Sequence, residues 1–302
     1  MKVHNESGRV SILISMYEQL EMTLSCIKCI RQTLDGVMEH EIILVDDASS
    51  RKTQESLRAI VSPPDKLILN SRARSFAYNN NIAAKSASGA FLCFLNNDVI
   101  VQGDWLSPML NVFNDYPEAG IVGNLQRRKE NNCFDHMGVV FAPEGNPRHF
   151  GQYFNKLPFK DKIKEWSAVT AASCITRKVT FEKLGGFDEI FVNGCEDVDL
   201  CLRMSQSGHK NYVSNESEVI HIKGATEGRK KHNNRNAKIL NERWGEYIRA
   251  NQSVQDQYLH AWTYLRRFLN NPASCNLNKI LHALLIQLRI LKVNKPDHFL
   301  NE

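Results

Sequence analysis

Long apolar runs are absent from this 302-residue chain. No stretch approaches the roughly 18 to 20 consecutive apolar residues that a helix needs to cross a bilayer. The opening residues, MKVHNESGRV, also lack the basic start and the apolar block of a secretory signal peptide. We therefore expect a cytoplasmic protein, with peripheral contact at the inner face of the cell membrane as an open alternative.

A strong charge of one sign is absent too, because the formal net charge is only +5. A value this small does not indicate a nucleic-acid partner, and it fits a small anionic ligand or an anionic membrane surface equally well. The eight cysteines are expected to be reduced thiols, since no secretory signal precedes them. Cys26 and Cys29 form a CxxC pair without a second pair at zinc spacing, which favours a structural role.

Strand-like and helix-like patterns alternate through the first third of the chain. Apolar residues make up 42% of the sequence, enough for a real core, and many fall in continuous β-rich runs. The expected strands are 10–15, 41–50, 66–70 and 90–101, and the expected helices between them are 20–34, 51–61 and 75–88. This alternation predicts an α/β fold with a doubly wound, mostly parallel sheet that binds ligands at the carboxyl ends of its strands.

The pattern after residue 101 is more mixed. Residues 127–165 are polar and punctuated by glycine and proline, which predicts loops or a small hairpin around GVVFAP. Elsewhere we expect helices at 104–116, 178–184 and 196–207, and strands at 119–126, 166–176 and 210–222. Beyond about residue 232 only helices are expected, at 234–248, 254–270 and 276–293.

These patterns divide the chain into an α/β domain over 1–248 and a helical extension over 249–302. The last expected helix has an apolar face made of Leu277, Ile280, Leu281, Leu284, Leu285, Leu288 and Leu291. Such a stripe packs on its own domain, forms a homodimer interface or lies in a membrane surface. The sequence leaves these three interpretations open.

Carboxylates interrupt or end two of the expected strands. Asp46 and Asp47 end the second strand, where a carboxylate can accept hydrogen bonds from a base or a ribose hydroxyl, although a turn or helix cap explains them equally well. Asp98, in LNNDV, would be buried if its strand continued, and an unpaired buried carboxylate is costly. A divalent cation shared with substrate phosphates would remove that cost. A polar turn is the simpler alternative.

The segment GCEDVDLCLR places three acids, Glu196, Asp197 and Asp199, at the start of an expected helix. The helix dipole alone explains acids there, but one of the adjacent pair could face the ligand edge and act as a general base. His221 follows an apolar strand, where most histidines are structural, although imidazole suits Mn²⁺. A basic cluster of Lys223, Arg229, Lys230, Lys231, His232 and Arg235 either neutralises a diphosphate or forms a solvated surface.

Together these segments resemble the family 2 glycosyltransferases with the GT-A fold. The resemblance covers about residues 9–248 and rests on the order and spacing of VSILISMYEQ, EIILVDDAS, residues 70–98, LGGFDE, GCEDVDLCLRM and VIHIKG. It implies a mixed, mostly parallel sheet flanked by helices. It also implies transfer of a sugar from a UDP-, GDP- or dTDP-linked donor to a hydroxyl on a growing glycan, a lipid-linked oligosaccharide or a protein glycan. The expected reaction inverts the anomeric centre and uses Mn²⁺ or Mg²⁺.

The resemblance also assigns roles to individual residues. The expected contacts to the nucleotide-sugar are Ser15, Met16, Tyr17, Glu18, Asp47, Asn81, Asn96 and Asn97. Of these, Asp47 would hydrogen-bond the base or ribose. Asp98 and His221 would be the metal-site residues, with His221 as a ligand or a diphosphate contact. Asp197 would be the catalytic base, with Glu196 beside it.

The chain departs from the family pattern at its metal motif, which often has a second acid but here reads Asn96-Asn97-Asp98. More of the metal binding would then fall to His221 and to the phosphates. Two other functions were weighed. A nucleotidyltransferase acting on sugar phosphates would carry a Gly-rich phosphate loop after the first strand, where this chain reads SMYEQLEM. A non-catalytic glycan-binding or partner-binding relative would be favoured by loss of Asp98 or Asp197, and both are present.

Overall fold

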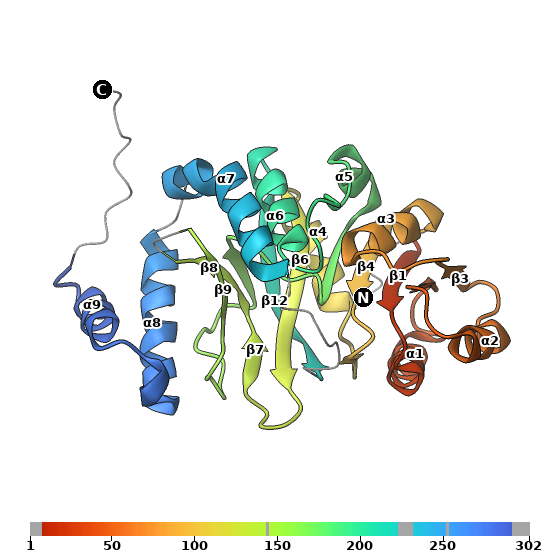
Figure 1. Ribbon diagram of the computed structural model, residues 1–302, viewed down its shortest axis with the longest axis horizontal. Coiled ribbons are helices and arrows are strands. Elements are labelled where there is room, and N and C mark those ends of the chain that lie inside the picture. The colour runs from red at the N-terminus through yellow and green to blue at the C-terminus, as the bar shows by residue number, and fades with distance from the viewer. Residues whose placement is uncertain (1–7, 143–144, 223–231, 252–253, 292–302) are drawn as a thin grey trace.

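The apolar runs of the N-terminal half fold as neighbouring parallel strands. The computed structural model describes residues 8–142, 145–222, 232–251 and 254–291 (Figure 1). Its first strands are β1 (Val10–Met16), β2 (His40–Asp46), β3 (Lys66–Leu69) and β4 (Phe91–Leu95), and all of their mutual pairings are parallel. The helices between them are α1 (Leu20–Leu34), α2 (Arg51–Ile60) and α3 (Phe76–Ser86), which confirms the expected alternation.

The second half adds strands of both directions to the same sheet. These are β5 (Val99–Ile100), β6 (Ala119–Arg128), β7 (Phe134–His136), β10 (Ile163–Trp166), β11 (Ser173–Arg177) and β12 (Lys210–His221). The sheet order is β10-β12-β6-β11-β4-β1-β2-β3, and only β11 and β10 on this path run against the others. The carboxyl ends of β1, β2, β4 and β12 therefore meet at one edge, as the mixed, mostly parallel sheet of the GT-A fold requires.

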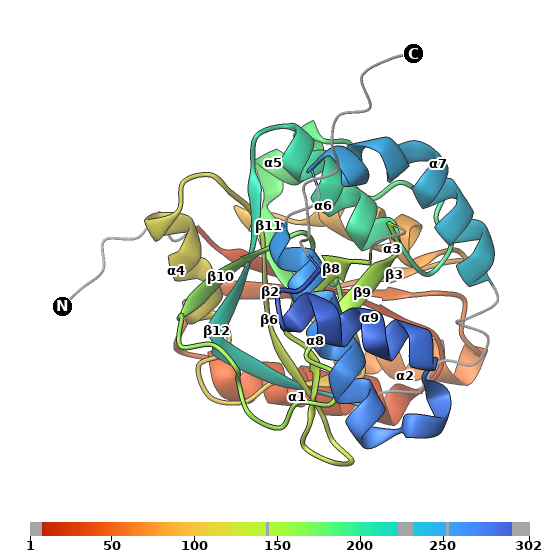
Figure 2. The same ribbon diagram turned by 90° about the vertical axis from the view of Figure 1, so that its left-hand side faces the viewer.

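Alternating side chains of the strands build one core on each face of the sheet. On one face, Ile12 and Ile14 pack with α1, α2 and α4 (Ser107–Asp115). On the other, Leu13 belongs to the core that includes α3, α5 (Lys178–Lys183), α6 (Glu196–Gln206) and α7 (Asn233–Asn251). In Figure 2, α5, α6 and α7 lie above the sheet, and α1 and α2 lie below it. Both faces are covered, which explains why the strands are continuously apolar.

The C-terminal helices pack on a small hairpin of β8 (Gly138–Phe141) and β9 (Pro147–Phe150) beside the main sheet. Trp262 of α8 (Val254–Asn270) stacks edge-on against Phe154, with ring centroids 5.2 Å apart. After the 3₁₀ turn η2 (Pro272–Ser274), α9 (Leu277–Gln287) packs on α8 (Figure 1). The domain boundary expected at 248 falls inside α7, and it stays a prediction. None of the helices in the described part of the chain is long and apolar enough to span a bilayer.

Two sequence predictions need correction. The strand expected over 166–176 is divided, because Trp166 ends β10 and β11 begins only at Ser173. The helix expected over 276–293 ends at Gln287, and residues beyond 291 lie outside the described part. The polar region 127–165 contains the hairpin expected around GVVFAP and, in addition, β7 and β10. The eight cysteines are all free, as expected for reduced thiols.

Candidate active site

Asp98 lies in a tight turn between β4 and β5. Asn96 starts the turn, where its N–H donates to the carbonyl of Ala172 at 2.9 Å and its own carbonyl accepts from Val99 N–H at 3.2 Å. The Asn97 amide donates to the hydroxyl of Thr23 at 3.0 Å. The polar triplet is therefore the polar turn that the sequence allowed, and it also holds the Asp98 carboxylate in a buried position at the carboxyl end of β4.

His221 faces Asp98 because of strand register. His221 ends β12, and the pairing of β12 with β5 sets it opposite Val99. Its Nε2 lies 3.2 Å from Asp98 Oδ1. The other ring nitrogen, Nδ1, lies 3.5 Å from Oδ2 of Asp135 on β7. The imidazole thus sits between two carboxylates, of which sequence reasoning found only Asp98.

The protonation of His221 depends on its burial and on the two neighbouring carboxylates, Asp98 and Asp135. Burial opposes protonation of His221, but Asp135 and Asp98 outweigh it and raise the pKa of the imidazole. Asp98 Oδ1 and His221 Nε2 are buried, and neither makes a well-aligned hydrogen bond to any residue in the described part. Buried polar atoms normally have such partners, so these two atoms are available to a ligand.

The geometry of this pair suits a divalent cation. Two ligand atoms that each lie about 2.1 Å from one octahedral ion, at a right angle, are about 3 Å apart. The Asp98 Oδ1 to His221 Nε2 distance of 3.2 Å matches that separation. The described residues contain no group of three or more His, Cys, Asp or Glu side chains arranged as a metal site. Asp98 and His221 would therefore supply part of a coordination shell, and substrate phosphates would supply the rest.

A chain of hydrogen bonds fixes Asp47 at the same edge of the sheet. Asp47 Oδ1 accepts from the amide of Asn70 at 3.0 Å and from the N–H of Arg74 at 2.8 Å. Asn70 also donates to Asn79 at 2.7 Å, and Asn79 donates to the hydroxyl of Ser15 at 3.0 Å. The network links the ends of β1, β2 and β3 to α3. Asp47 and Ser15 were predicted from the sequence, whereas Asn70 and Asn79 were missed.

Other residues expected to contact the nucleotide have varied surroundings. Met16 is buried, and Tyr17 is 57% exposed beside it. Glu18 caps α2, because its carboxylate accepts from Ser50 N–H at 2.5 Å and from the Thr53 hydroxyl at 2.7 Å, and these bonds lower its pKa. Asn81 exchanges two hydrogen bonds with the backbone of Phe187 in the LGGFDE segment. Nucleotide contacts of Glu18 and Asn81 stay predictions, and both side chains already serve the fold.

The three acids at the start of α6 have separate environments. Asp197 is half-buried, and its Oδ2 accepts from Ala171 N–H at 3.1 Å. Glu196 is buried and accepts from Gly194 N–H at 2.6 Å. Asp199 is fully buried and anchors α7, because Trp244 Nε1 and Arg243 donate to it at 2.8 and 2.9 Å. Of the three, Asp197 is the most accessible carboxylate, in line with its predicted role as base.

Residues 171 and 172 connect Asp197 to the turn that carries Asp98. Ala171 N–H donates to the Asp197 carboxylate, and the next carbonyl, of Ala172, accepts from Asn96 N–H. We call this dipeptide the Ala171–Ala172 bridge. Adjacent α-carbons of a chain are about 3.8 Å apart, so the bridge sets the candidate base and the candidate metal turn side by side.

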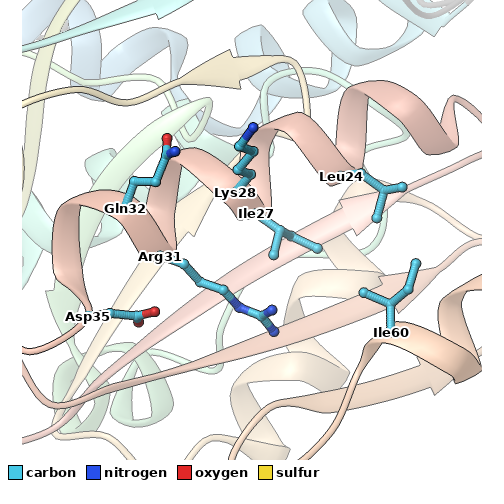
Figure 3. Close-up of a pocket in the computed structure, with 7 residues that line it drawn as sticks. All are labelled: Leu24, Ile27, Lys28, Arg31, Gln32, Asp35 and Ile60. Atoms are coloured by element: carbon cyan, nitrogen blue, oxygen red, sulfur yellow. The ribbon is translucent and has the colours of Figure 1, made fainter.

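A hollow on the surface of the described residues lies away from these side chains. Figure 3 shows this hollow of about 500 Å³ on α1, lined by Leu24, Ile27, Lys28, Arg31, Gln32, Asp35 and, from α2, Ile60. None of the predicted site residues lines it. Of the basic cluster, Lys223, Arg229, Lys230 and Lys231 lie outside the described residues. Arg235 donates to the carbonyl of Ile190 at 2.8 Å.

Comparisons with known proteins identify relatives of this chain. The O-antigen biosynthesis protein RfbC of Myxococcus xanthus is 34% identical over 199 residues, which cover 62% of this chain but only 15% of RfbC. An N-acetylglucosaminyl-diphospho-decaprenol L-rhamnosyltransferase of Mycobacterium tuberculosis is 24% identical over 62% of this chain and 68% of its own length.

Among solved structures, the mannosyltransferase PcManGT of Pyrobaculum calidifontis, in complex with GDP-Man and Mn²⁺, superposes with a TM-score of 0.59. It is 17% identical, and the match covers 94% of this chain and 81% of that one. The two proteins therefore share a fold. The sequence model described as glycosyl transferase family 2 matches residues 11–184, more than half of the chain. The chain thus belongs to glycosyl transferase family 2.

Proposed function

We propose that this chain transfers a sugar from a nucleotide-diphospho-sugar to a hydroxyl group of a glycan, a lipid-linked oligosaccharide or a protein glycan, with inversion at the anomeric carbon. The observation that carries the proposal is the Ala171–Ala172 bridge. It connects Asp197, a half-buried carboxylate, through backbone hydrogen bonds to the turn that carries Asp98, and Asp98 faces His221 with atoms that lack well-aligned partners in the described structure. A base beside a diphosphate-binding centre is the arrangement that such a displacement requires.

Each part of the site has a separate task in this reaction. Asp47, held by Asn70, accepts a hydrogen bond from the base or the ribose of the donor. Asp98 and His221 would hold Mn²⁺ or Mg²⁺, which when bound supplies positive charge that stabilises the departing diphosphate. Asp197 takes the proton from the acceptor hydroxyl as its oxygen attacks. Glu196 is a poorer candidate for the base, because its side chain is buried whereas that of Asp197 is only half-buried.

A thermal-shift screen tests the proposed donor. The full chain is heated with UDP-, GDP- or dTDP-sugars, each with Mn²⁺, with Mg²⁺ or with EDTA. A ligand at 100 times its Kd stabilises the folded state by about 2.7 kcal/mol, so we expect one nucleotide class to raise the Tm by several degrees, and only with metal. Release of free nucleoside diphosphate with a glycan acceptor confirms transfer. A protein that no nucleotide-sugar stabilises, with or without metal, contradicts the proposal.

We propose that the acceptor side of this protein works at a membrane surface, through the exposed face of α9. Leu277, Leu281, Leu284 and Leu288 are all exposed along this face. Residues 257–291 contain four Lys or Arg residues, among them the exposed Lys279 and Arg289, and no Asp or Glu. An anionic lipid surface complements both features, because it attracts the positive charge of this segment while its apolar layer takes up the leucines. The rhamnosyltransferase relative, named for a decaprenol-linked acceptor, supports the same setting.

Vesicle binding tests this contact. The chain is expected to co-sediment with vesicles that contain phosphatidylglycerol and much less with pure phosphatidylcholine. Leu281→Ser combined with Leu284→Ser should abolish binding, because burial of the leucines supplies the apolar part of the attraction. Val179→Ser, at an apolar residue of α5 that is 67% exposed, is the matched control and should bind like wild type. Equal binding to neutral vesicles, or a stable dimer through α9 in sedimentation equilibrium, overturns the assignment.

A further inference from the structure

The geometry points to Asp135 as the positioning residue for His221. The inference rests on the proposed function, since it concerns the side chain that would hold the metal together with Asp98. Asp135 lies on β7, in a region whose polar pattern gave no sign of a role. Its Oδ2 is 3.5 Å from His221 Nδ1, while Nε2 on the opposite side of the ring is 3.2 Å from Asp98. The ring therefore has a carboxylate near each of its two nitrogens.

This arrangement decides which nitrogen of His221 is available to a cation. A neutral imidazole carries its proton on one nitrogen and a lone pair on the other. A cation held by Asp98 needs the lone pair of Nε2, and the carboxylate of Asp135 beside Nδ1 then accepts the proton that the other ring nitrogen carries. Carboxylates that act on metal-bound histidines in this way also raise the basicity of the ring. Asp135 would thus set the tautomer and the orientation of His221 without touching the metal or the substrate.

The supports of Asp135 are suited to this task. Its side chain is only 1% exposed, and its Oδ1 accepts from Arg128 Nε at 3.0 Å. Arg128 is paired with His221 across β6 and β12, so Arg128, Asp135 and His221 lie on three adjacent strands. A carboxylate buried this deeply needs fixed partners, and the second oxygen of Asp135 is directed to the imidazole. A simple ion pair with Arg128 would not require that contact.

Manganese affinity, measured from the EPR signal of free Mn²⁺, tests the inference on the full chain. Asp135→Ala should weaken Mn²⁺ binding by roughly 10- to 100-fold, the usual cost of losing such a partner. Asp135→Asn should fall between Asp135→Ala and wild type, because its amide oxygen still accepts from Nδ1. The matched control is Glu218→Gln, which breaks the ion pair between Arg127 and Glu218 (2.7 Å). These two residues lie on β6 and β12, the strands that carry Arg128 and His221. The control variant should bind Mn²⁺ like wild type.

The outcomes separate this inference from the proposed function. If Asp98→Ala abolishes Mn²⁺ binding and Asp135→Ala binds like wild type, the positioning role is overturned and the metal site stands. If Asp98→Ala also binds like wild type, the metal site itself is wrong. A loss of affinity in Glu218→Gln equal to that in Asp135→Ala shows that the effect is structural, and it too overturns the role.

A second measurement needs no substitution. In long-range ¹H–¹⁵N NMR spectra of the wild-type chain saturated with Mg²⁺, at a pH where the ring is neutral, we expect the proton of His221 on Nδ1. A proton on Nε2 would refute the role of Asp135, whatever the variants do. This readout keeps the inference testable even where Asp135→Ala fails to fold.

Discussion

Asp197→Asn is expected to lower the rate of sugar transfer by about 10²- to 10⁴-fold, the usual contribution of a general base, and to leave donor binding intact. The amide has the size of the carboxylate and keeps an oxygen that can accept from Ala171 N–H. It cannot accept a proton from the acceptor hydroxyl. The defect should therefore appear in kcat, while the Kd for the donor, measured by calorimetry with metal present, stays unchanged.

Asp199→Asn is the matched control for this variant. It makes the same chemical change two residues further along α6, but Asp199 is fully buried and pairs with Arg203, Arg243 and Trp244. We expect Asp199→Asn to lower the Tm because it removes a charge that these partners need. Its folded fraction should retain transfer within a few-fold of wild type. Transfer by Asp197→Asn at a near-normal rate would exclude Asp197 as the base.

Asp98→Ala is expected to abolish metal-dependent donor binding, with a loss larger than the roughly 100-fold that removal of an outer partner of a metal ligand can cost. No neighbour can replace Asp98. Asn97 is bonded to Thr23, and Asn96 carries no charge. Without Asp98, His221 alone would face the cation, and Mn²⁺ and Mg²⁺ both favour carboxylate oxygens.

Calorimetric titration of the donor, with Mn²⁺ and with EDTA, measures this effect. Asp104→Ala serves as the control because Asp104 is an exposed acid in the same stretch that only caps α4, accepting from Ser107 N–H at 3.1 Å. It should bind the donor like wild type. In wild type, EDTA should reproduce the defect of Asp98→Ala. Donor binding by Asp98→Ala that still responds to Mn²⁺ would disprove the metal role of Asp98.

Much of the fold could be predicted because its strands are buried on both faces. Continuous apolar runs such as that around Leu13 and Ile14 mark the strands, and the helices between them have clear apolar spacing. The polar region 127–165 offered no such period. Its short strands are defined by pairing with β6 and β12, which local sequence does not encode. For the same reason, no pattern in the sequence indicated a role for Asp135.

The structure brings together side chains that the sequence singled out for their chemistry, whose roles stay predictions, and it adds supports that the sequence did not indicate. Asp98 and His221 were paired through the family resemblance, and the structure brings them within 3.2 Å. Asn70 and Asn79 escaped notice because single asparagines in a polar stretch are common. The Ala171–Ala172 bridge escaped because it acts through backbone groups, which every residue possesses.

That bridge has a consequence for how the site can change during evolution. Its two contacts use the N–H of residue 171 and the carbonyl of residue 172, so their chemistry is the same for almost any pair of small residues. Proline at 171 is the exception, because it has no N–H to donate. Burial of both methyl groups limits the size of the side chains but not their identity. Substitutions can therefore accumulate here while the spacing between base and metal turn is inherited unchanged, and residue identity alone would understate the importance of these two positions.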